Sequence, residues 1–165
     1  MLQTREIQFI NKDEEMPRLT HTWLIANLIE LIGPYLKKTK YGRISYDLDI
    51  YFPHSSRKLR PDLSIISFEK LANQDMDGSF YGVPDWIIEV VSPMSLIEDG
   101  SVKRQFYAQE GVPEYWIVFP ETRTINAYSL KDGRYELSDV RAEKGILIPV
   151  LFPELNMDLS QIFDF

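Results

Sequence analysis

Two apolar runs of strand length, separated by one segment of helix length, constrain the fold of this chain more than any other feature. The runs are residues 86–91 and 115–119, and the segment between them, residues 95–110, is predicted to be a helix that ends at Gly111. A strand, a helix of about four turns and a second strand joined by short links form a βαβ crossover. We therefore expect the two strands to be parallel and buried.

The first of these runs contains a single carboxylate, Glu89. Burying an ionised carboxylate without a partner is costly, so the fold has to supply a cation, a hydrogen-bond network or a raised pKa. Two partners are candidates. Asp62, which opens the earlier apolar run 63–68, could share a metal ion with Glu89, and Lys103, on the helix that follows, could pair with it.

The remaining segments predict one long helix and further strands. Apolar residues recur at helical spacing over residues 20–38, and they alternate over 44–52 as in a half-buried strand. Residues 60–68 predict a second strand antiparallel to the latter. Further expected segments are a short strand at 7–10, a polar excursion at 70–82, and β additions at 124–130, 135–138 and 146–151. We expect a mixed α/β fold (α+β, with a mixed sheet) that forms a single domain over residues 1–165.

Composition limits the classes of protein to consider. The chain has 165 residues, of which 44% are hydrophobic and 26% are charged, as in an ordinary globular domain. It has no run of the roughly 18 apolar residues that a membrane span needs, and its start does not resemble a signal peptide. We therefore expect a soluble, cytoplasmic protein with no membrane partner.

Charge and ligand types limit the binding partners and metals. The net charge of −7 argues against a protein that coats nucleic acid non-specifically. Basic clusters at 37–43 and 57–60 could still face one groove, or they could be solvated loop ends. With no cysteine and only two histidines, a bound cation would be held by oxygen atoms, which favours magnesium, manganese or calcium.

Four blocks of sequence resemble a known family. They are residues 60–66 (RPDLSII), 85–93 (DWIIEVVSP), 99–103 (DGSVK) and 107–118 (YAQEGVPEYWIV), and they occur in the family's order. The chain resembles the bacterial restriction-endonuclease family of the PD-(D/E)xK nuclease superfamily, from about residue 16 to residue 163. The resemblance implies a restriction-endonuclease-like αβββαβ core with extra C-terminal strands, and magnesium-dependent hydrolysis of DNA phosphodiester bonds.

The resemblance also implies a catalytic set. Asp62 and Glu89 match the two acids of the superfamily, whereas the lysine expected two residues after the second acid is replaced by Val91. Lys103 occupies the helix position that is thought to take the lysine's role in this family. A second departure is Phe119, where relatives commonly carry Asp, and this departure concerns a peripheral contact.

The chemistry of these residues supports the same site. Side chains from facing positions of neighbouring strands, such as Asp62 and Glu89, can converge on one cation. The backbone carbonyl of Val90 is a candidate third ligand. Magnesium, or manganese in its place, would polarise the phosphate and activate a water, while Lys103 would orient that water or neutralise charge on the phosphate.

Accessory roles are open for His21, Asp99 and Tyr107. His21 matches a position where relatives often carry histidine, although a histidine on a helix surface commonly has no special role. Asp99, Lys103 and Tyr107 fall at i, i+4 and i+8 on one helical stripe. This stripe would order Lys103 within a site or form an exposed ion pair.

Simpler interpretations stand beside the catalytic one. Glu89 and Lys103 are compatible with a structural ion pair, and Asp62 with a cap on the turn after Pro61. A second function class is a catalytically degenerate member of the same fold that binds a partner or assembles as a dimer. A third is a small enzyme that acts on a phosphorylated metabolite, which no motif supports.

We also expect a homodimer. The additions after residue 120 carry aromatic and apolar residues, among them Tyr128, Tyr135, Leu151 and Phe152, and the sheet edges need covering. Cleavage of both strands of a duplex would need one site per strand, which a symmetric dimer supplies. The target sequence, and the choice between DNA and RNA, are not determined by the sequence.

Overall fold

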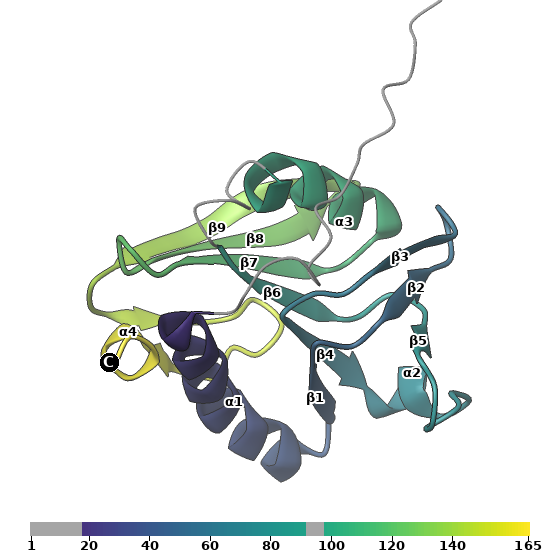
Figure 1. Ribbon diagram of the computed structural model, residues 1–165, viewed down its shortest axis with the longest axis horizontal. Coiled ribbons are helices and arrows are strands. Elements are labelled where there is room, and N and C mark those ends of the chain that lie inside the picture. The colour runs from purple at the N-terminus through teal and green to yellow at the C-terminus, as the bar shows by residue number, and fades with distance from the viewer. Residues whose placement is uncertain (1–17, 92–97) are drawn as a thin grey trace, which may run out of the picture.

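A six-stranded mixed sheet with helices on both faces forms the centre of the fold (Figure 1). The computed structural model describes residues 18–91 and 98–165. The strand order is β1-β4-β6-β7-β8-β9. These strands are β1 (Gly42–Tyr46), β4 (Leu63–Ser67), β6 (Trp86–Val90), β7 (Glu114–Phe119), β8 (Thr124–Lys131) and β9 (Arg134–Ala142).

The shorter elements surround this sheet. The helices are α1 (Leu19–Thr39), α2 (Phe68–Leu71), the π-helix η2 (Glu98–Lys103), α3 (Arg104–Glu110) and α4 (Leu159–Ile162). The remaining strands are β2 (Ile50–Phe52), β3 (Arg57–Leu59), β5 (Phe80–Tyr81), β10 (Ile146–Leu147) and β11 (Met157–Asp158). Strands β3, β2 and β5 form a second, three-stranded sheet, and β10 pairs with β11. None of the helices within residues 18–91 and 98–165 is long and apolar enough to cross a membrane.

Each face of the central sheet buries its own apolar core. One core joins α1 and the C-terminal segment to the sheet through side chains such as Leu28, Trp86 and Trp116. The other core joins α3 and the small sheet to the opposite face through Phe52, Phe106 and Ile117. Because both faces are covered, β6 and β7 are buried on both sides, which explains their nearly continuous apolar sequences.

The predicted crossover is confirmed, but its helix differs in form. Strands β6 and β7 are parallel, and α3 ends at Gly111, whose φ of 86° is the left-handed conformation that glycine adopts without strain. Of the predicted helix at 95–110, the described residues 98–110 form a π-helix over Glu98–Lys103 and an α-helix over Arg104–Glu110. Gly100 and Ser101 are weak helix formers and lie within this turn. Residues 92–97 lie outside the described part.

The predicted strand at 44–52 is wrong as a single element. It is two strands, β1 and β2, which are separated by Asp47 with a φ of 49°. The predicted strand at 60–68 starts later, as β4, and β1 pairs antiparallel with it as expected. The apolar alternation crosses the break because Ile44 packs against the core under α1, whereas Ile50 and Phe52 are buried in the core under α3. Tyr46, which lies on the same predicted face, is 68% exposed.

Other boundaries also moved. The segment at 70–82, expected to be an irregular excursion, contains the end of α2 and all of β5. Strand β9 is longer than residues 135–138, whereas only two residues of 146–151 form a strand. The expected helix at 20–38 is confirmed as α1. The strand expected at 7–10 lies outside the described residues.

Candidate active site

Asp62 and Glu89 meet where β4 begins and β6 ends. Leu63 of β4 pairs with Ile88 of β6, so Asp62, the residue before β4, lies across from Glu89. The backbone nitrogen of Asp62 lies 3.4 Å from Oε2 of Glu89, and the N–H of Val90 donates to Oδ2 of Asp62 at 2.7 Å. The two carboxylates predicted from the sequence therefore converge.

Lys103 and Tyr107 both contact one oxygen of Glu89. Nζ of Lys103 lies 3.2 Å from Oε1, and the hydroxyl of Tyr107 donates to the same oxygen at 2.8 Å. Glu89 and Tyr107 are fully buried, and Lys103 is only 5% exposed. A buried carboxylate is tolerated when a cation and hydrogen bonds compensate its lost hydration, and this site supplies both.

The join between η2 and α3 places these two partners. Lys103 is the last residue of η2, and Tyr107 follows four residues later in α3, so both side chains lie on the same side of the helical segment. π-Helical turns often occur at functional sites, where they redirect a side chain. Asp99 is in η2, but its side chain lies outside the described part of the structure.

His21 reaches the site from α1. Its Nε2 lies 3.4 Å from Oδ1 of Asp62, and its side chain is 28% exposed. The sequence allowed His21 to be an ordinary surface residue, and the structure instead brings it to the first acid. Protonated His21 would form an ion pair with Asp62, whereas neutral His21 could donate or accept one hydrogen bond.

The donor types at this position suit a hard divalent cation. Asp62 and Glu89 provide carboxylate oxygens, which magnesium and manganese prefer. The N–H of Val90 points toward Asp62, and in a strand the N–H and C=O of one residue point to the same side, so the Val90 carbonyl also faces this position. Within residues 18–91 and 98–165, however, no group of three or more acidic, histidine or cysteine side chains is gathered as a complete ligand set. Backbone and water would therefore have to complete the coordination.

Two other buried carboxylates hold the framework around this site, and the sequence did not single them out. Glu110 of α3 accepts a hydrogen bond from the backbone N–H of His54 at 3.1 Å, which ties the β2–β3 hairpin to α3. Asp85 accepts from the N–H of Ser67 at 2.7 Å and lies 2.7 Å from Nζ of Lys70. Asp85 precedes β6, whereas Glu89 lies near the end of that strand.

Comparison with known proteins identifies the family. The model of the Uma2 family, described as "Putative restriction endonuclease", matches residues 12–160, so the chain belongs to this family. The resemblance found in the sequence is thereby confirmed. No curated protein sequence matches the chain.

A solved structure shares the fold. It is a crystal structure from Anabaena variabilis ATCC 29413, described as a "putative nuclease belonging to DUF820". The TM-score is 0.74 at 20% sequence identity, and the match covers 91% of this chain and 83% of that chain. The expected mixed α+β fold of the restriction-endonuclease type is therefore confirmed.

Proposed function

We propose that this protein is a metal-dependent endonuclease that hydrolyses phosphodiester bonds of DNA. The observation that carries the proposal is the convergence of Asp62, Glu89 and the backbone of Val90. The ammonium group of Lys103 contacts the carboxylate of Glu89 at the same place. Membership of the family and the nuclease description of the solved structure support this reaction class.

Each residue has a distinct role in the proposed chemistry. Asp62, Glu89 and the Val90 carbonyl would hold magnesium, or manganese in its place. The metal would supply Lewis acidity that stabilises charge on the phosphate and favours deprotonation of a water. Lys103 would neutralise negative charge as the phosphate is attacked, and Tyr107 would keep the Glu89 carboxylate in position through its hydroxyl.

The alternative is a non-cleaving member of the fold. Its support is the geometry of Glu89, Lys103 and Tyr107, which form a compact buried ion pair with a third hydrogen-bonding group. In such a cluster the ammonium group and the hydroxyl compensate the buried carboxylate without a metal. The missing lysine at Val91 also fits this alternative.

Cleavage with defined metals separates the two functions. Purified protein is incubated with supercoiled plasmid, linear duplex, single-stranded DNA and RNA, with magnesium, manganese, calcium or a chelator. We expect cleavage of DNA with magnesium and manganese, and none with the chelator. Asp62→Asn should remove the activity. Cleavage that continues in the chelator or in this variant would show a contaminant or a different site, and a lack of cleavage under every condition would favour the alternative.

We also propose a homodimer. The N–H of Val140 is already bound to Oδ1 of Asp139 at 2.8 Å, and its carbonyl accepts from Nη1 of Arg141 at 3.3 Å. At Val140, side chains therefore occupy the backbone groups of the edge strand β9, which disfavours pairing with another strand at this position. Tyr128 and Phe152, two residues on which the expectation of a dimer rested, are buried within the chain. Light scattering at micromolar concentration measures the assembly state, and a monomer would contradict the proposal.

A further inference from the structure

The small three-stranded sheet has one buried face and one outward face. Ile50, Leu59 and Phe80 pair across its strands and are buried in the core beneath α3. Side chains alternate along a strand, so their neighbours Tyr51, Lys58 and Tyr81 point to the other side. Tyr51 pairs with Lys58 on one side and with Tyr81 on the other, which makes a continuous row across β3, β2 and β5.

Two aromatic rings in this row are stacked and held in place. The rings of Tyr51 and Tyr81 are nearly parallel, at 8°, with centroids 4.7 Å apart, and Tyr81 is 64% exposed. The amide side chain of Gln74 donates to the carbonyl of Tyr81 at 3.1 Å and accepts from its N–H at 3.0 Å. The N–H of Gly82 donates to the carbonyl of Tyr51 at 3.0 Å. The exposed side chain of Tyr81 therefore extends from a backbone that hydrogen bonds hold on both sides.

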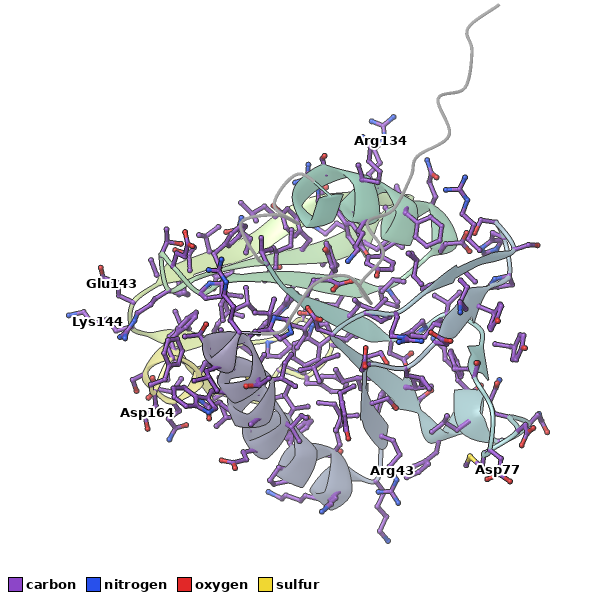
Figure 2. All side chains as sticks on the ribbon, viewed as in Figure 1. Arg43, Asp77, Arg134, Glu143, Lys144 and Asp164 are labelled. Atoms are coloured by element: carbon purple, nitrogen blue, oxygen red, sulfur yellow. The ribbon has the colours of Figure 1, made fainter. Side chains whose placement is uncertain are left out.

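Charge is distributed unevenly around the two tyrosines. Lys58 and Arg60 share one carboxylate, that of Asp49, at 3.1 and 2.7 Å. Two cations against one carboxylate leave this β3 side positive on balance. The turn that leads into β5 carries Asp75 and Asp77, and Figure 2 shows Asp77 at the end of the molecule that holds α2 and β5.

This face lies close to the candidate active site. Lys58 precedes Asp62 by four residues, so the chain between them spans at most about 14 Å. The N–H of Asp47, in the link between β1 and β2, donates to the carbonyl of Asp62 at 3.2 Å. The open end of the hairpin, where β2 begins and β3 ends, therefore lies near Asp62, within reach of a nucleic acid strand a few nucleotides long.

We propose that Tyr51, Tyr81 and the basic side of β3 bind single-stranded nucleic acid next to the cleavage site. The inference rests on the proposed nuclease function and gives the conformation of its substrate. A base would stack on Tyr81, and the phosphates would follow the β3 side, away from Asp75 and Asp77. Bases inside a duplex present their edges and not their faces, so a platform of this kind selects unpaired nucleotides.

Binding measured without cleavage tests the platform separately from the chemistry. The full chain is titrated in chelator against a fluorescein-labelled oligothymidine of about 12 nucleotides and against a duplex of equal length. We expect tighter binding of the single strand. Tyr81→Ala should weaken it by about tenfold or more, whereas Tyr81→Phe keeps the ring and should bind like the parent. Lys58→Gln should reduce the salt dependence of binding.

Phe68→Ala is the matched control. Phe68 is another exposed aromatic residue with an arginine, Arg43, 5.2 Å from its ring centroid, but it follows the end of β4 opposite to Asp62. This variant should bind like the parent. Melting temperatures of the variants exclude unfolding as the cause of weaker binding, and Tyr51→Ala provides a second test of the same platform.

The outcomes for the platform and for the proposed reaction are distinguishable. If Tyr81→Ala and Tyr51→Ala bind like the parent, or if the duplex binds as tightly as the single strand, the platform is wrong even when the protein cleaves DNA. If the tyrosine variants lose binding but the parent cleaves nothing with any metal, the platform holds and the nuclease proposal fails.

Discussion

Glu89 and Glu114 are both fully buried on neighbouring parallel strands, yet their surroundings differ in kind. Glu89 contacts the ammonium group of Lys103 and the hydroxyl of Tyr107 on the α3 side of the sheet. Glu114 accepts hydrogen bonds from Nε1 of Trp116 and from the backbone N–H groups of Val150 and Leu151. These three donors are all neutral.

This difference distinguishes Glu89, a candidate catalytic residue, from Glu114, which has a structural role. Glu114 fastens the segment after β10 to the first residue of β7, and burial raises its pKa, although the hydrogen bonds partly oppose this shift. Glu89 instead lies beside a second carboxylate, Asp62, and a cation. A buried acid becomes a candidate for catalysis through such convergent charged groups and not through burial alone.

The largest expected effect is on cleavage by Glu89→Gln, compared with Glu114→Gln. Loss of a proposed metal ligand should lower the cleavage rate by on the order of a thousandfold or more, because the charge that holds the metal is removed. Glu114→Gln should retain most of the parent's rate at a temperature well below its melting point. Cleavage of plasmid and of single-stranded DNA under single-turnover conditions measures both rates. Equal losses in the two variants would abolish the distinction between them.

Lys103→Met should have the next largest effect on the rate. Removal of the cation should slow cleavage by about a hundredfold to a thousandfold, through lost stabilisation of charge on the phosphate. It should also lower the metal-free free energy of unfolding by about 3 to 5 kcal/mol, since Glu89 is left buried without its cation.

The double variant Glu89→Gln with Lys103→Met distinguishes these two effects. It should recover much of the lost stability, because no charge stays unpaired, but no activity. Urea unfolding and cleavage are measured on the same samples. A Lys103→Met variant that is destabilised and still cleaves at the parental rate would leave Lys103 with a structural role only.

The raised pKa of Glu114 should make the stability of the protein depend on pH. Its pKa is raised above the ordinary value of 4.5, so the folded state binds this proton more tightly than the unfolded state does. The stability that this proton contributes is present below pH 4.5 and is lost as the pH rises through the folded-state pKa. The parent should therefore lose stability relative to Glu114→Gln over this range. Urea unfolding at several pH values measures the difference, and a difference of opposite slope would contradict the assignment.

Tyr107→Phe should have the smallest effect. The variant removes one hydroxyl that donates to Oε1 of Glu89 at 2.8 Å and keeps the ring in its aromatic core. A hydrogen bond to a charged group contributes about 1.5 to 3 kcal/mol, so we expect a loss of stability in this range and a cleavage rate lower by roughly tenfold. The affinity for manganese, measured by calorimetry, tests whether Tyr107 positions a ligand. A purely structural role would leave it unchanged.

Several features were predictable from the sequence because they depend on local order along the chain. The apolar runs and the glycine after the helix predicted the β6–α3–β7 crossover, and the resemblance predicted the family and the fold. The positions of Asp62, Glu89 and Lys103 at the predicted strand, strand and helix indicated which charged groups had to compensate one another. That inference required only the cost of burying a charge.

Only the tertiary structure decided which groups share an atom. The contact of His21 with Asp62 joins positions far apart in the sequence, and the shared oxygen of Glu89 depends on the turn of η2 that aims Lys103. The same holds for the division of residues 44–52 between two sheets, since alternation reports a buried face but not its partner. Periodicity and the cost of burying a charge can be evaluated within one segment of the sequence. Distances between side chains of different segments depend on how those segments pack in three dimensions.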